Sequence, residues 1–129
     1  MKSHMAREDI NRIMVEHGEI SILIEQLRLA IKGGTREAVE RERTAFFSFL
    51  EEHFNYEKGL MEFINYPHVS VHISEHTKLI EICQSVIDGS CSNAALASSI
   101  CKQITGYLNT HTDSFDFPLM HYIRQKFFI

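Results

Sequence analysis

Residues 46–64 read FFSFLEEHFNYEKGLMEFI, and this stretch carries the clearest indication of the fold. Its apolar residues recur at steps of three and four, the spacing that places side chains on one face of an α-helix. The pattern extends over about residues 36–65. Tyr66-Pro67 ends it, because a residue that precedes proline is disfavoured in the helical region. The sequence therefore predicts a long amphipathic helix here.

Three more segments show the same apolar periodicity. We expect helices over about residues 8–32, 70–87 and 93–113, and a short amphipathic helix or arm over residues 119–129. Gly33-Gly34 and Asp88-Gly89-Ser90 are predicted turns, and Pro118 limits the last long helix. The residues expected to face the core are Ile10, Ile13, Met14, Ile20, Leu23, Ile24, Leu27, Ile31, Val39, Phe46, Phe47, Phe49, Leu50, Phe54, Leu60, Met61, Ile64, Val71, Ile73, Leu79, Ile80, Cys83, Val86, Ile87, Leu96, Ile100, Ile104, Tyr107 and Leu108.

The chain has 129 residues, which suffices for one domain with a buried core. Residues 1–5 could in part be a cloning scar, so His4 carries no functional weight. Long helices with short connections pack against their neighbours in antiparallel order. We predict an all-α fold over residues 1–129, an antiparallel up-down-up-down four-helix bundle with a short C-terminal helix or arm.

Composition excludes several classes of function. The net charge is −4 and no basic stripe is present, which argues against a nucleic-acid partner. No apolar run approaches the ~20 residues that span a membrane, and the N-terminus lacks the features of a signal peptide. The three cysteines, Cys83, Cys91 and Cys101, show no metal-type pairing and are expected to be free thiols. We expect a cytoplasmic protein.

Histidines and carboxylates recur along the predicted helices. Residues four apart share one face of a helix, so an H-x-x-x-E or H-x-x-x-H pair can reach one interior point. On a regular helix a spacing of five rotates the second side chain by about 140°. We expect the fourth helix to end or loosen before Pro118, which lets Asp116 turn back towards His111. The candidate ligands, in order of the helices, are His17, then His53 and Glu57, then His72 and His76, then His111 and Asp116.

Each of these motifs also has an ordinary explanation. A single histidine on an apolar face is usually a hydrogen-bonded core residue, and H-x-x-x-H suits zinc equally well. The joint pattern favours a metal centre, because burying five imidazoles and two carboxylates without partners would be costly. These ligands suit iron, manganese or zinc, and bundle cores can hold dinuclear carboxylate centres. Seven ligands are too many for one ion. With two bridging carboxylates and an oxo or hydroxo bridge, they leave about one position open on two ions, as a small diatomic ligand requires.

The number, order and spacing of these ligands resemble the hemerythrin family, specifically its bacterial single-domain members, over about residues 10–122. Phe54 after the second-helix histidine, Leu60-Met61 and Tyr66-Pro67 agree with the family as well. The resemblance implies two iron ions with an Fe-O-Fe or Fe-OH-Fe bridge. It assigns His72, His76 and His111 to one six-coordinate iron, His17 and His53 to the iron with the open position, and Glu57 and Asp116 to both as bridges.

In the family, dioxygen takes two electrons from the di-iron(II) centre and a proton from the bridging hydroxide, and is held reversibly as hydroperoxide. A small anion such as azide or chloride can occupy the same position. The resemblance places Ile20, Phe54, Tyr107, Leu108 and Thr112 around the open iron, although packing in the core would explain them equally well.

The sequence departs from the family at three positions. Thr112 stands where an aliphatic residue is usual, Tyr107 where tryptophan is frequent and Met14 where aspartate is common. Thr112 could donate a hydrogen bond to a bound ligand or admit water, so we expect faster autoxidation than in typical oxygen carriers. His68 and His121 have no place in the ligand pattern and are expected in a turn and on the surface.

Several functions are compatible with this pattern. We expect an oxygen-binding protein for carriage, storage or sensing rather than an enzyme. The alternatives are a di-iron redox enzyme that reduces peroxide, nitric oxide or dioxygen, and a redox- or oxygen-sensing module of a larger signalling protein. A metal-free bundle would require the seven ligands to be coincidental. The Phe127-Phe128-Ile129 end could dock on another subunit or fold back on the core.

Overall fold

The computed structural model describes residues 3–90 and 93–128, and this part of the chain is helical and contains no β-strand. The all-α class predicted from the sequence is therefore confirmed. The elements are α1 (Ser3–Gly33), α2 (Arg36–Phe63), α3 (Val69–Ser90), the short 3-10 helix η1 (Ala94–Leu96), α4 (Ala97–His111), the π-helical turn η2 (Thr112–Asp116) and α5 (Phe117–Phe127).

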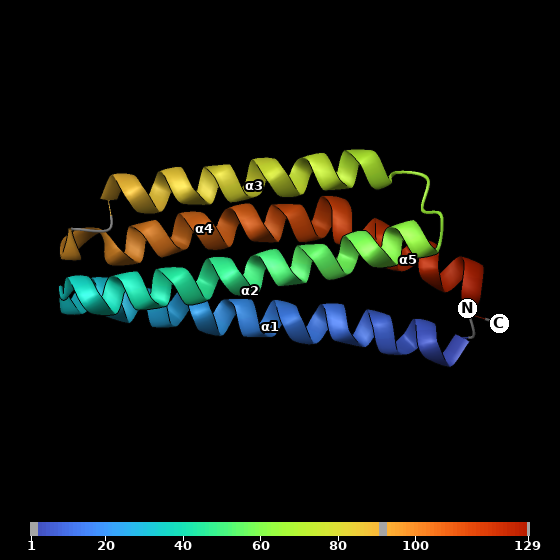
Figure 1. Ribbon diagram of the computed structural model, residues 1–129, viewed down its shortest axis with the longest axis horizontal. Helices are drawn as coiled ribbons and strands as arrows, with labels where there is room; N and C mark the ends of the chain where they lie inside the picture. The colour runs from blue at the N-terminus through green and yellow to red at the C-terminus, as the bar shows by residue number, and fades with distance from the viewer. Residues whose placement is uncertain (1–2, 91–92, 129) are drawn as a thin grey trace.

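Helices α1–α4 lie side by side, and α5 continues beyond the end of α4 (Figure 1). Helix α1 packs against α2 and α4, and α3 packs against the same two helices, so the neighbours form a closed ring around an interior. Helix α5 contacts α1. This arrangement is compatible with the antiparallel bundle expected from the sequence.

Short connections with left-handed residues join the first three helices. Gly34 has φ 78°, and its N–H donates to the carbonyl oxygens of Ala30 and Ile31, each at 3.2 Å, which ends α1 in the manner of a glycine cap. Asn65 has φ 55° after the end of α2, and the N–H of Tyr66 then donates to Met61 O at 2.9 Å. The predicted C-terminal ends of these two helices agree with the structure within about two residues, whereas α1 begins about five residues earlier than predicted.

The predicted turn at Asp88-Gly89-Ser90 is wrong, because α3 continues to Ser90. A single glycine costs a helix only ~1 kcal/mol relative to alanine, which the neighbouring turns can compensate. The next helical segment starts at η1, where the side chain of Asn93 accepts a hydrogen bond from the N–H of Ala95 at 3.0 Å. The expected helix or arm at residues 119–129 begins earlier, at Phe117.

Four residues expected in the core are exposed: Met14 by 53%, Val71 by 60%, and Leu96 and Tyr107 by 40% each. Consecutive residues lie about 100° apart around a helix, so only one of two adjacent apolar residues can point directly inwards. Ile13 occupies that direction beside Met14 and is fully buried, and His72 occupies it beside Val71.

Two apolar clusters form the core, with a polar layer between them along the bundle. One cluster includes Leu27, Phe46 and Ile104, and the other includes Ile13, Met61 and others from α5. Along each long segment of the chain the predicted ligands lie where the residues that belong to one cluster end and those that belong to the other begin. Packing on both sides therefore fixes the height at which these ligands meet.

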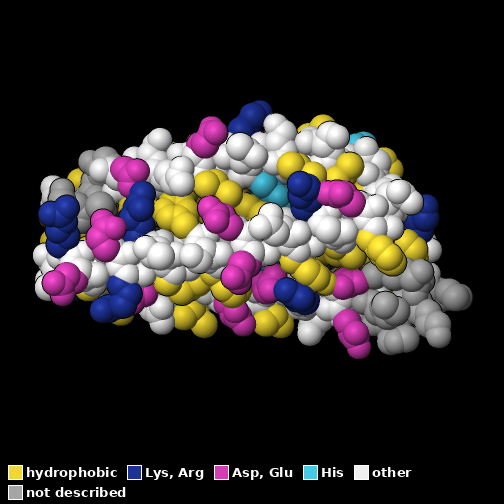
Figure 2. Space-filling model, viewed as in Figure 1, with side chains coloured by type: hydrophobic (Ala, Val, Ile, Leu, Met, Phe, Trp, Pro, Cys, Tyr) yellow, Lys and Arg dark blue, Asp and Glu magenta, His cyan; other side chains and the backbone are white. Residues whose placement is uncertain are grey.

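The C-terminal residues and the cysteines are buried to different degrees. Phe127 and Phe128 are partly buried against the second cluster, so this end folds back on the core, while Ile129 lies outside the described residues. Cys83 and Cys101 are buried free thiols, as expected, and Cys91 also lies outside the described residues. Among the residues described, no helix is both long enough and apolar enough to cross a membrane. On the face shown in Figure 2, acidic and basic side chains are interspersed.

Candidate metal centre

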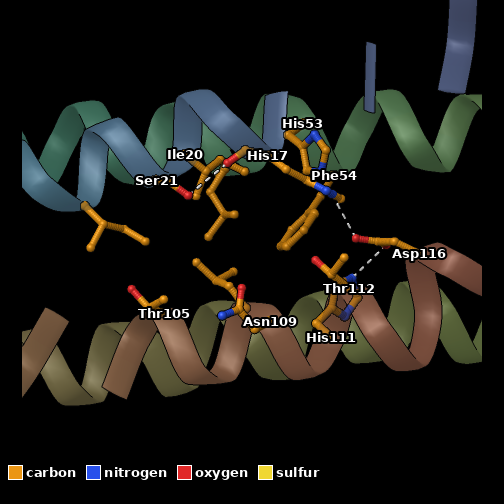
Figure 3. Close-up of a pocket in the computed structure, with 13 residues that line it drawn as sticks. His17, Ile20, Ser21, His53, Phe54, Thr105, Asn109, His111, Thr112 and Asp116 are labelled. Carbon is orange, nitrogen blue, oxygen red and sulfur yellow. Dashed lines mark hydrogen bonds and ion pairs between the residues drawn. The ribbon is translucent and has the colours of Figure 1, made fainter. Parts of the chain in front are cut away.

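The polar layer consists of histidine and carboxylate side chains that point into the bundle from all four long segments. Apart from His17, whose side chain is 23% exposed, each has at most 5% of its surface accessible. Figure 3 shows His17 and His53 facing His111 and Asp116 across the interior. The members are His17, His53, Glu57, His72, His76, His111 and Asp116, so the structure brings all seven predicted ligands together.

Glu57 directs its two oxygens at different histidines. Its Oε2 lies 3.1 Å from Nε2 of His53. Its Oε1 lies 3.0 Å from Nε2 of His76 and 3.6 Å from Nε2 of His72. The carboxylate of Glu57 therefore stands between the histidine of α2 and the histidine pair of α3.

Asp116 divides its oxygens in the same way. Its Oδ2 lies 3.0 Å from Nε2 of His17. Its Oδ1 lies 3.1 Å from Nε2 of His72 and 3.2 Å from Nε2 of His111. Two of these contacts, to His17 and His111, are drawn as dashed lines in Figure 3.

The side chains form two overlapping groups whose potential ligand atoms lie within 4.8 Å of one another. One group, the five-ligand group, contains His72, His76, His111 and the two carboxylates. The other, the four-ligand group, contains His17, His53 and the same two carboxylates. Glu57 and Asp116 are thus shared between the groups.

Many of the potential ligand atoms point into the space between the side chains and are not oriented to form hydrogen bonds with one another. Nε2 of His17, His76 and His111 and both oxygens of Glu57 are buried without a hydrogen-bond partner among the described residues. Several of them nevertheless lie at ion-pair distance from one another. Buried polar atoms left in this way are costly unless something binds them. The donor set, with nitrogen and oxygen ligands, fits a metal ion.

The π-helical turn η2 explains how residues five apart reach the same site. In this turn the N–H of Phe117 donates to the carbonyl of Thr112, five residues earlier, so the turn is wider than an α-helical one. His111 and Asp116 consequently lie on one face. The expectation that the helix loosens before Pro118 is confirmed, whereas an end of the helix is not observed, because α5 follows directly.

Removing one residue from η2 should preserve the site, and adding one should destroy it. Deletion of the exposed Ser114 converts the turn to α-helical spacing, which keeps His111 and Asp116 on one face. Insertion of an alanine after Ser114 rotates Asp116 and α5 by about 100°. We expect metal bound per chain, measured by elemental analysis, to be retained in the deletion variant and lost in the insertion variant. Equal loss in both would contradict this role of the turn.

Charge distribution within the layer follows from the ion pairs. Burial disfavours the charged form of His72, but the hydrogen bond with Asp116 and the nearby carboxylate of Glu57 outweigh it and raise the pKa of His72 to about 9. Burial also opposes ionisation of Glu57 and Asp116, and their histidine partners nevertheless hold the pKa of both carboxyls well below the usual range. Burial dominates at His76 and lowers its pKa.

The metal-free protein should lose stability as the pH rises through about 9. A folded pKa of about 9 for His72, against 6.5 for an unperturbed histidine, stabilises the fold fully below pH 6.5 and not above pH 9. We expect the free energy of unfolding in urea to fall by roughly 2–3 kcal/mol between these limits. In His72→Gln the fall should be much smaller. A flat profile for the metal-free wild type would contradict the ion pairs described.

A cavity of about 140 Å³ adjoins the four-ligand group, between α1 and α4. Its wall includes His17, His53 and Asp116 of that group, and also His111 of the five-ligand group. The predicted pocket residues Ile20, Phe54, Leu108 and Thr112 also line it. Ser21, Thr105 and Asn109 complete a polar part of the wall (Figure 3).

Tyr107 does not line this cavity, and 40% of its surface is exposed. The expectation that it walls the open position is therefore corrected. On α4 the cavity face follows steps of three and four through Thr105, Leu108, Asn109 and Thr112. Tyr107 is rotated by about 100° from Leu108, towards the opposite edge of the buried face.

Aromatic rings support two of the histidines. Phe54 stacks on His76 with centroids 3.8 Å apart and an interplanar angle of 5°. Phe115 stacks on His111 at 5.3 Å and 14°. These contacts restrict rotation of both imidazoles, so their Nε2 atoms are held towards the carboxylates.

Sequence reasoning missed several residues around the site. Thr105 and Asn109 precede Thr112 by seven and three residues, and Ser21 follows His17 by four, so helical spacing alone could have identified them. Glu16 carries no comparable signal, because the histidine that it contacts, His53, lies on another helix.

His68 and His121, which have no place in the ligand pattern, lie where the sequence placed them. His68 is exposed in the connection between α2 and α3, with its ring 5.7 Å from that of Tyr66. His121 is exposed on α5.

Comparison of the chain with models of known protein families, with curated proteins and with solved structures found no match in any of the three. The fold and the site together define a helical protein with a buried histidine–carboxylate cluster that could hold a metal ion.

Proposed function

We propose that this protein is a hemerythrin-like, antiparallel up-down-up-down bundle that holds two iron ions and binds dioxygen. The observation that carries the proposal is the division of both carboxylates between two histidine groups. Glu57 and Asp116 each direct one oxygen to the histidines of one group and the other oxygen to the histidines of the other group, as bridging of two ions requires. The order of the ligands along the chain resembles that of hemerythrins and supports the same conclusion.

The unequal groups support one saturated and one open position. His72, His76 and His111 would hold one iron, and His17 and His53 would hold the other, with Glu57 and Asp116 shared. Two ferrous ions, when bound, supply the pair of electrons that reversible dioxygen binding requires. Because the cavity adjoins the four-ligand group, a small molecule can reach the less saturated position.

The chain's own residues would control what enters this position. Ile20, Phe54 and Leu108 form the apolar part of the cavity wall, which disfavours water beside the ligand site. Thr112 lies beside them and carries a hydroxyl that can donate a hydrogen bond to an oxygen ligand. Azide or chloride would compete for the same space.

Reversible colour change tests the oxygen-binding part of the proposal. The iron-loaded protein is reduced without air, and its visible spectrum is recorded while oxygen is admitted and then removed. We expect a charge-transfer band that appears with oxygen and disappears on its removal. Immediate, irreversible conversion to the oxidised form would overturn reversible binding and would favour the enzyme described next.

A second candidate function is a cytoplasmic di-iron enzyme that reduces peroxide, nitric oxide or dioxygen. The polar part of the cavity wall favours it, because Ser21, Thr105, Asn109 and Thr112 could hydrogen-bond a polar substrate or admit water. A redox- or oxygen-sensing role uses the same site.

Replacing Thr112 with valine should slow autoxidation. Valine has nearly the same shape as threonine but no hydroxyl, so water and protons lose a hydrogen-bonding group in the cavity wall. We expect the half-life of the oxygen-bound form, followed by its visible band, to increase by roughly tenfold, which corresponds to about 1.4 kcal/mol. Tyr107→Phe, outside the cavity, is the control. An unchanged half-life in Thr112→Val would exclude this residue as the cause of fast oxidation.

A further inference from the structure

His53 has a carboxylate on each side of its ring. Its Nε2 lies 3.1 Å from Glu57 Oε2, on the side of the metal centre. Its Nδ1 lies 2.9 Å from Oε1 of Glu16, a residue of α1 that the metal groups do not include. A carboxylate accepts hydrogen bonds only, so the Nδ1 of His53 carries the proton in this contact.

Glu16 is itself held in place by residues of α1 and α2. Its Oε2 lies 3.2 Å from Nε of Arg12, and its side chain is only 15% exposed. The guanidinium of Arg12 lies 3.8 Å from the centre of the Tyr56 ring, and the Tyr56 hydroxyl donates to Asp9. This network leads from a buried ligand to the surface and fixes the position of the Glu16 carboxylate.

The contact distinguishes His53 from other ligands. Nδ1 of His72 and Nδ1 of His111 are buried without a hydrogen-bond partner among the described residues. Both belong to the five-ligand group, whereas His53 belongs to the four-ligand group. The carboxylate of Glu16 therefore acts, through His53, on the four-ligand group, which the cavity adjoins.

We propose that Glu16 is a positioning residue that makes His53 a stronger ligand, and that it thereby lowers the reduction potential of the ion in the four-ligand group. This inference rests on the proposed function for the identity of the ion. A carboxylate that accepts from the distal N–H fixes the tautomer and orientation of a histidine ligand and raises its basicity. A more basic imidazole favours the ferric over the ferrous ion.

Arg12 acts in the opposite direction. Its positive charge on Oε2 weakens the pull of Glu16 on the His53 proton. Loss of the guanidinium should leave Glu16 a stronger acceptor, and His53 a stronger ligand. Substitutions of Glu16 and of Arg12, both on α1, are therefore expected to shift the reduction potential in opposite directions.

Midpoint potentials of the iron-loaded protein test this assignment. Glu16→Gln keeps an oxygen that can accept from Nδ1 but removes the negative charge, so the geometry of His53 is retained. We expect its potential to rise by about 59 mV, a tenfold loss of preference for the ferric ion. Arg12→Gln should lower the potential, and Glu19→Gln, an exposed carboxylate of α1, should leave it unchanged.

A zinc titration of the metal-free protein gives a readout that does not depend on iron. Glu16→Leu removes the acceptor completely, and we expect about tenfold weaker zinc binding, with Glu19→Gln as the control. Unchanged affinity here, or a potential in Glu16→Gln that follows Glu19→Gln, would overturn the role of Glu16. If wild-type protein binds no iron but Glu16→Leu weakens zinc binding, the proposed function fails and the positioning role of Glu16 stands.

Discussion

Replacing Glu57 with glutamine is expected to abolish stable binding of iron. Both oxygens of this carboxylate face histidines, Oε2 towards His53 and Oε1 towards His76 and His72. An amide has one oxygen and places an NH₂ group on the other side, so one of the two groups loses a ligand and meets a donor instead. We expect the affinity for iron to fall by more than ~100-fold, a larger loss than is typical for residues that only hydrogen-bond to a metal ligand.

Iron per chain after expression in iron-replete cells, measured with the helical circular dichroism of the same samples, checks this expectation. Glu52→Gln is the matched control, because Glu52 is an exposed carboxylate of the same helix. Iron content equal to wild type in Glu57→Gln, with the fold intact, would rule out Glu57 as a bridging ligand.

Removing the metal is expected to lower the melting temperature by at least ~10 °C. The cluster joins side chains from α1, α2, α3, α4 and η2, so metal ions held there would bind the folded protein and not the unfolded chain. Metal held a thousandfold above its dissociation constant contributes ~4 kcal/mol, and 1 kcal/mol moves the melting temperature of a domain this size by several degrees.

Calorimetry of the protein before and after anaerobic treatment with a chelator measures the effect. The Glu57→Gln variant serves as a control, since it has little metal to lose and its melting temperature should hardly change. If wild type and its chelated form melt at the same temperature, the cluster contributes nothing through a bound metal.

The sequence predicted which seven side chains form the histidine–carboxylate cluster, because the information for it is local. His53 and Glu57 lie on one face by helical spacing, as do His72 and His76, and periodic apolar residues orient both faces towards the interior. The layer in which the seven side chains meet then follows from the clusters on either side. Spacing could not show how the Glu57 and Asp116 oxygens are divided, because that depends on packing between helices.

Features outside regular periodicity were harder to predict. Pro118 indicated that the fourth helix loosens, but only the structure shows a π turn that leads directly into α5. The family resemblance places Tyr107 at the cavity, but in this chain Tyr107 lies at the opposite edge of the buried face of α4 and does not line it. Glu16 was missed because its partner, His53, lies on another helix.

Metal analysis of the protein purified from iron-replete cells tests the central claim most directly. Elemental quantification against protein concentration, together with the absorption of the oxidised sample, identifies the ion and its stoichiometry. The proposed function predicts two irons per chain in a coupled pair bridged by Glu57 and Asp116. A single zinc ion per chain, or a well-folded chain without metal, would contradict it.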